Sequence, residues 1–208
     1  MAKKKKKKSH APAQKFSPAS YLRTKVRDFP FAKILINANW DEVGDELEDG
    51  ASSTQLATIG VARQQPSGKY VAGMYLVDRL CLGLKSTTFR YNLDEEELDE
   101  FFAMLHPEAP PVEVEYPLVH NLIYGSIAYA EDLGFKPDKN FNLTQYILEP
   151  DTEDVPLIEL EYGYKGKPFF IGGPYDNAMQ IVDHLLARLG KDGFEYLVPI
   201  GGDGFDFE

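Results

Sequence analysis

Apolar and polar positions alternate most regularly between residues 56 and 78, where two β-forming runs flank the sequence Gln-Pro-Ser-Gly-Lys. Pro and Gly at such a junction are typical of a tight turn, so the pattern predicts a β-hairpin. In the second run, residues 70–78, both alternating sets are largely apolar. A strand of this kind is covered on both faces and lies in the middle of a sheet.

Other segments show weaker patterns that are typical of strands or of helices. Further strands are expected at residues 31–38 and 86–92, and a second hairpin over residues 156–173. Helical spacing of apolar residues predicts helices at 94–106, 117–133 and 174–189, in addition to a short basic helix that begins at Ser17 and Pro18. Pro117 is suited to the start of the longest helix, and Gly134 and Gly190 to helix ends.

These elements favour an α+β fold, a mainly antiparallel sheet with two β-hairpins packed by three to four helices, over a doubly wound parallel sheet. The length of 208 residues is enough for one domain with its own core. We expect a disordered basic arm at residues 1–16, a single globular domain at 17–200 and a loose acidic C-terminus at 201–208.

Composition narrows the class of protein. Hydrophobic residues make up 43% of the chain and charged residues 26%, which is ordinary for a globular protein. No apolar run approaches the length of about 20 residues that spans a bilayer, and no apolar segment follows the first lysines. The single cysteine, Cys81, has no partner for an internal disulfide. The expectation is a cytoplasmic protein that is not embedded in a membrane.

Charge is segregated along the chain. Ten of the 22 Lys and Arg residues lie in residues 1–27 and all 33 Asp and Glu residues lie in 28–208, which gives formal charges of about +10 and −21. The first segment attracts phosphate-rich polymers, and RNA or a ribonucleoprotein is the partner we favour. The candidate polyanion-binding residues are Lys3, Lys4, Lys5, Lys6, Lys7, Lys8, Lys15, Arg23, Lys25 and Arg27.

The acidic remainder supports a second hypothesis from a different class. A body with a formal charge of −21 is suited to a basic protein partner, as in adaptor or immunity proteins. It also repels nucleic acid and anionic lipid over most of its surface, so it keeps binding through the basic arm weak and reversible. On either hypothesis the protein is a binding protein and not an enzyme.

One stretch, "YLVDRLCLGLK" at residues 75–85, contains candidate catalytic side chains. Lys85 near Cys81 can lower the pKa of the thiol, Asp78 can orient a base, and His120 from another element can serve as that base. The alternative is a buried structural cysteine, which the flanking leucines favour. A hydrolase or thiol enzyme built on Cys81, His120 and Asp78 is therefore the enzymatic alternative.

The remaining candidate motifs are weaker. The acidic runs lack the spacing of an EF-hand loop, and Cys81 has no neighbouring ligand, so we expect neither a metal nor another cofactor. The stretch "FFIGGPYDN" at residues 169–177 is not a phosphate-binding glycine motif, because Pro174 removes an amide and Asp176 adds a negative charge. A tight turn explains it. His184 falls on the polar face of the last helix, so we expect it to be solvated.

Three longer stretches and one residue pair resemble a family of uncharacterised bacterial proteins. They are "DFPFAKILINANWDEVG", "YLVDRLCLGLK", "HNLIYGSIAYAEDLGFKPDKNF" and the Ala-Arg pair ahead of the hairpin turn. The resemblance covers roughly residues 20–175 and is most specific in the pattern L-V-D-x-x-C-L-G-x-K. It implies a bacterial cytoplasmic protein. It assigns no activity and no role to any residue, and the lysine arm and acidic tail lie outside it.

Overall fold

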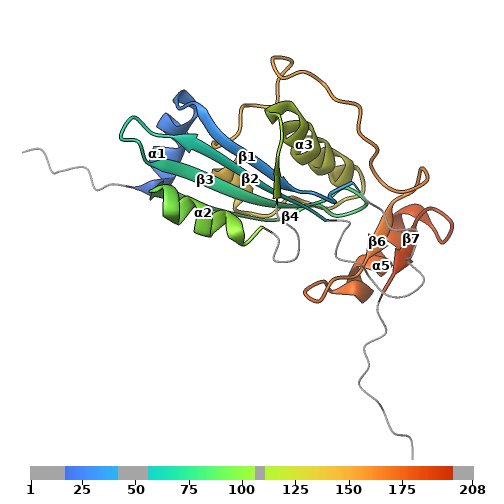
Figure 1. The fold of residues 1–208 in the computed structure, drawn as a ribbon. Coiled ribbons are helices and arrows are strands. Elements are labelled where there is room, and N and C mark those ends of the chain that lie inside the picture. The colour runs from blue at the N-terminus through green and yellow to red at the C-terminus, as the bar shows by residue number, and fades with distance from the viewer. Residues whose placement is uncertain (1–16, 42–55, 106–110, 199–208) are drawn as a thin grey trace, which may run out of the picture.

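A computed structural model describes residues 17–41, 56–105 and 111–198. Their main feature is a five-stranded antiparallel sheet in the order β4-β3-β2-β1-β5 (Figure 1), which confirms the α+β class. The strands are β1 (Phe31–Asn37), β2 (Leu56–Gln64), β3 (Tyr70–Asp78), β4 (Gly83–Leu93) and β5 (Pro111–Glu113).

The hairpin predicted from the strongest alternation is confirmed. Strands β2 and β3 pair from Leu56 opposite Asp78 to Gln64 opposite Tyr70, and Gly68 in the turn adopts a φ of +83°. Strand β3 pairs with β2 along one edge and with β4 along the other. Its apolar residues belong to two clusters, one with helical residues on each face of the sheet. The central position predicted for this strand is therefore correct.

Helices cover both faces of the sheet (Figure 1). One face packs against α3 (Tyr116–Asp132) and against α1 (Pro18–Lys25), and the other packs against α2 (Glu95–Ala103). We call these the α3 face and the α2 face. Two shorter helices are η1 (Val26–Asp28) and α4 (Phe141–Thr144).

The helix ends at Ser17 and Gly134 agree with the prediction, and the capping box of α2 is found in the structure only. The Ser17 hydroxyl accepts a hydrogen bond from the Ser20 N–H at 3.4 Å. Asp94 and Glu97 form a capping box at the start of α2, in which each side chain accepts from the other residue's backbone N–H. Gly134, with a φ of +89°, follows the end of α3. The signals at Ser17 and Gly134 need no long-range contact, which is why sequence alone located these two helix ends.

The second predicted hairpin is wrong. Tyr164 and Lys167 form only an isolated antiparallel bridge, and β6 (Phe169–Ile171) pairs in parallel with β7 (Glu195–Leu197). Helix α5 (Ala178–Leu189) connects these two strands. They form a small β-α-β unit, because two parallel strands require a crossover between them.

The β-α-β unit packs on the end of the main sheet where β3 turns into β4. A shared apolar cluster joins residues of that turn, the end of α3 and the small unit: Cys81, Leu133, Phe170, Leu185 and Phe194. The turn that carries the candidate cysteine is therefore enclosed by two parts of the fold.

Candidate functional site

Asp78 organises the turn between β3 and β4. Its carboxylate accepts hydrogen bonds from the backbone N–H groups of Leu80 at 2.9 Å, Cys81 at 3.1 Å and Leu82 at 3.2 Å. Burial raises the pKa of this carboxyl, and the nearby charge of Lys85 and the N–H donors act in the opposite direction. Asp78 therefore shapes this loop, and its hydrogen-bond partners here are backbone amides and not a histidine.

Cys81 is buried within the apolar cluster at this turn. Burial raises the pKa of its thiol well above the usual value, and the negative charge of Asp78 adds to that increase, whereas Lys85 lowers it only in part. The nucleophilic form of cysteine is the thiolate, so this environment suppresses reactivity. The burial expected of a structural cysteine is confirmed.

His120 lies on α3, away from this turn. Its Nε2 is 3.3 Å from the carbonyl oxygen of Pro150, and burial lowers its pKa. Gly83, which follows the Cys81 turn, lies against Ala130. Ala130 is ten residues along α3 from His120, which corresponds to about 15 Å.

The structure therefore does not assemble the predicted group of Cys81, His120 and Asp78. The cysteine lies in an apolar cluster, the aspartate serves as a backbone acceptor, and the histidine lies two to three helical turns away, at about 3.6 residues per turn. The enzymatic alternative loses its structural basis in this form, and we do not propose it further.

The predicted polyanion-binding residues divide into three groups. Lys3 to Lys8 and Lys15 lie outside the described residues. Arg23 and Lys25 are exposed in the last turn of α1. Arg27 is instead committed to the fold, because its guanidinium donates to the carbonyl oxygens of Leu148 at 2.8 Å and Gln145 at 3.0 Å. Arg27 is therefore no longer a candidate polyanion-binding residue.

The loop "GGPYDN" is a turn closed by its own carboxylate. Asp176 accepts a hydrogen bond from the Gly173 N–H at 2.9 Å and forms an ion pair with Lys85 at 2.6 Å. The tight-turn interpretation agrees with this geometry. The prediction of a solvated His184 is wrong, because its Nε2 lies 2.9 Å from the carbonyl oxygen of Leu133 and its ring packs on Phe135.

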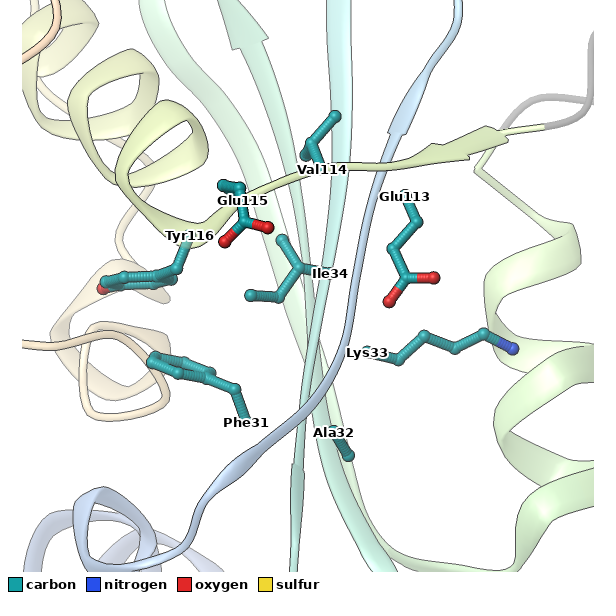
Figure 2. Close-up of a pocket in the computed structure, with 8 residues that line it drawn as sticks. All are labelled: Phe31, Ala32, Lys33, Ile34, Glu113, Val114, Glu115 and Tyr116. Atoms are coloured by element: carbon teal, nitrogen blue, oxygen red, sulfur yellow. The ribbon is translucent and has the colours of Figure 1, made fainter.

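A groove of about 450 Å³ opens where β1 and the chain after β5 diverge (Figure 2). The β1–β5 pairing extends only from Asn37 to Leu35, followed by one hydrogen bond from the Val114 N–H to the Ile34 carbonyl at 3.1 Å. The chain then turns into α3 at Tyr116, with Pro117 in its first turn. Within the described residues, no strand pairs with residues 31–33 on this side of β1.

Aromatic rings form one side of the groove. Phe31 stacks on Tyr116 with ring centroids 4.2 Å apart, and both rings pack against the core on the α3 face. The Arg63 guanidinium lies on the Phe31 ring, 3.8 Å from its centroid. Phe31 therefore lies between the Tyr116 ring and the Arg63 guanidinium.

Charged side chains line the other parts of the groove. Lys33 points across the α2 face and forms an ion pair with Asp99 of α2 at 2.7 Å. Figure 2 shows the Glu113 side chain on the same side of β1 as Lys33, and the Glu115 carboxylate on the other side of β1, near the chain that leads to α3. Neither glutamate forms an ion pair within the described residues, and both are exposed. The groove therefore has an excess of negative charge.

Arg63 is the buried residue that sequence reasoning missed. Its side chain is only 2% exposed, and it donates to the carbonyl oxygens of Ile147 at 2.6 Å, Phe29 at 2.7 Å and Arg27 at 3.2 Å. It also pairs with Glu149 at 2.6 Å. The available signal was the Ala62-Arg63 pair ahead of the hairpin turn, which places an arginine directly after apolar residues of a predicted strand.

A second groove, of about 410 Å³, lies between α3 and residues 151–162. Asn121 attaches this segment to the helix: its amide donates to Pro156 at 2.9 Å, and its side-chain oxygen accepts from the Ile158 N–H at 3.3 Å. His120 lines the same groove, but its ring is packed between Tyr116 and Tyr124. The polar groups here hold the segment in place.

Comparison with protein-family models, with curated proteins and with solved structures finds no match for this chain. The resemblance to a bacterial family stays a prediction. No helix among the described residues is both long and apolar enough to cross a bilayer. In the same part of the chain, no group of three or more His, Cys, Asp or Glu side chains is arranged to hold a metal ion.

Proposed function

We propose that this is a non-enzymatic binding protein whose Lys-rich N-terminal segment associates with RNA or a ribonucleoprotein. The observation that carries the proposal is the surface of α1. This helix contains no acidic residue, exposes Arg23 and Lys25, and is anchored in the core by Leu22. The basic segment before it is thus joined to a fixed basic helix.

Lysine contacts to phosphate make binding strong at low salt and weak at high salt. If Lys3 to Lys8 each neutralise one phosphate of a single strand, affinity falls by about 300-fold between 50 and 200 mM salt, at a slope of about −0.7 per contact. Such contacts carry no base information, so the binding is independent of RNA sequence. The acidic body limits the affinity because it repels the same polymer.

The test measures binding of labelled oligo(U) by fluorescence anisotropy over a range of salt concentrations. Deletion of residues 1–16 is expected to abolish most of the salt-dependent binding. The double variant Arg23→Gln/Lys25→Gln is expected to make the salt slope shallower by about 1.4, since two phosphate contacts to a single strand are lost. The matched control is Lys136→Gln/Lys139→Gln, which removes two exposed lysines beyond α3. Equal binding by all four proteins, or by none, contradicts the proposal.

A second candidate function is binding of a basic protein by the acidic body. The specific observation in its favour is the groove along β1, where Glu113 and Glu115 are exposed without cationic partners in the described residues. A pull-down in which nuclease treatment leaves basic proteins bound supports this candidate. Loss of every bound protein after nuclease treatment removes it.

A further inference from the structure

We propose that the groove along the outer edge of β1 binds an extended, basic segment of a partner protein as an added strand. This inference rests on the second candidate function and is independent of RNA binding. It names the site and the chemistry of the partner: a segment in which Lys or Arg alternates with apolar residues.

The first reason is the unpaired edge of β1. Pairing with β5 stops at Ile34, yet β1 continues back to Phe31. The chain leaves the sheet at Tyr116 because Pro117 starts a helix there. An extended peptide can occupy the position that a longer β5 would take, since strand addition to an open sheet edge is a common mode of peptide recognition.

The second reason is the division of the groove into two sides. Ile34, Phe31 and Tyr116 belong to the α3 face, and all three pack against its apolar core. Lys33 and Glu113 lie on the α2 face, where Glu113 is opposite Leu35. Side chains of an added strand alternate between the two faces. One set therefore meets aromatic and aliphatic groups and the other meets charged groups.

The third reason is the sign of the charge. Lys33 is already paired with Asp99, so Glu113 and Glu115 remain as the uncompensated charges beside the groove. These two carboxylates favour Lys and Arg in the bound segment. They also disfavour a second copy of this chain at the same edge, because the copy brings its own glutamates against them. Charged side chains at an edge are a general device against self-association.

The fourth reason is that the aromatic side of the groove is already fixed. The Tyr116 hydroxyl accepts a hydrogen bond from the Glu149 N–H at 2.7 Å, and Phe31 is stacked between Tyr116 and the buried Arg63. A surface that is ordered before binding loses little conformational entropy when a ligand arrives. The groove is thus preformed in the absence of a partner.

The test uses the full chain and a fluorescein-labelled peptide of four Lys-Val repeats at low salt. Binding is followed by anisotropy, with a peptide of four Glu-Val repeats as the charge control. The variant Glu113→Gln/Glu115→Gln is expected to weaken binding of the Lys-Val peptide by about two- to thirtyfold, the range for two exposed ion pairs. The matched control, Glu131→Gln/Glu161→Gln, removes two exposed carboxylates elsewhere and is expected to change affinity less than twofold.

Two further measurements separate strand addition from general charge attraction. Bound peptide is expected to protect from hydrogen exchange those backbone amides between Phe31 and Ile34 that point to the open edge, and not the alternate amides that point to β2. Two further peptides carry methyl groups on the backbone nitrogens, one at its lysines and the other at its valines. Only one of the two is expected to lose binding, since only one edge of the peptide strand pairs with β1. Equal affinity of both methylated forms, or of the two Gln variants, overturns the proposal while leaving acidic-body binding intact. No binding of any basic peptide removes both.

Discussion

At the scale of single residues, Arg63 is a buried polar side chain that joins several segments of the fold. It connects β2 to three backbone carbonyls and to Glu149, and it supports the Phe31 ring at the groove. A buried guanidinium of this kind is stabilising only while all its partners are present. Its removal leaves several carbonyl oxygens without donors in a dry site.

We expect Arg63→Met to lower the free energy of unfolding by about 3–5 kcal/mol. Arg63→Lys is expected to recover only part of this loss, because a lysine has no planar fork of donors. The measurement is urea denaturation, with the shift in midpoint converted at an unchanged slope. The control is Arg90→Lys, an exposed arginine over the Phe101 ring, for which we expect less than about 0.5 kcal/mol. Similar losses at the two positions contradict this account.

At the scale of elements, Gly83 shows why α3 packs closely on the start of β4. Its φ is +68°, and a Cβ at this position lies 2.6 Å from the Ala130 Cβ and 2.7 Å from the Ser126 carbonyl oxygen. Both a left-handed backbone and close approach of a helix therefore require glycine. The glycine in the pattern L-V-D-x-x-C-L-G-x-K thus has a packing role and needs no catalytic explanation.

We expect Gly83→Ala to lower the free energy of unfolding by about 2–4 kcal/mol, since backbone strain and overpacking add. Gly68→Ala is the matched control: its φ is +83°, but no atom lies within 4 Å of its added Cβ. The control isolates the backbone cost, about 1 kcal/mol. Thermal and urea unfolding measure both variants. Equal destabilisation at the two glycines means that the contact with α3 contributes nothing.

The elements that sequence predicted well are those with local signals. The first hairpin has its turn residues in place, α2 has acidic residues in its first turn, and α3 has Pro117 in its first turn and ends before Gly134. The hairpin prediction for residues 156–173 failed because β6 pairs with β7, which follows α5 in the chain. Nothing within the segment itself encodes that partner. Short apolar runs next to glycines fit a hairpin and a crossover equally well.

At the scale of the whole molecule, the candidate site depended on contacts that no local pattern contains. The groove exists because β5 pairs with only part of β1 and the chain then departs into α3. The charge of the groove was foreseeable from the acidic body, but its position was not. Conversely, Asp78, Cys81 and Lys85 are close together as their spacing suggested, yet they stabilise a turn and an interface.

Lys85 and Asp176 form a partly buried ion pair that connects the main sheet to the β-α-β unit, and it can be compared with an exposed pair. The side chains are 16% and 11% exposed, whereas those of Lys33 and Asp99 are 38% and 59% exposed at nearly the same separation. Removing one partner of a buried pair leaves a charge in a poorly solvated site, but an exposed partner is compensated by water.

We therefore expect Asp176→Asn to lower the free energy of unfolding by about 1–3 kcal/mol, between the values for exposed and fully buried pairs, and Asp99→Asn by less than about 1 kcal/mol. Asparagine keeps an acceptor for the Gly173 N–H, so the loss of stability in Asp176→Asn measures the loss of the negative charge. The double variant Lys85→Met/Asp176→Asn is expected to recover a large part of the loss, since no buried charge is then left unpaired. Hydrogen exchange is expected to show the loss first in β6 and β7. If Asp99→Asn costs as much as Asp176→Asn, or if the β-α-β unit keeps its protection, the ion pair does not hold the two parts together.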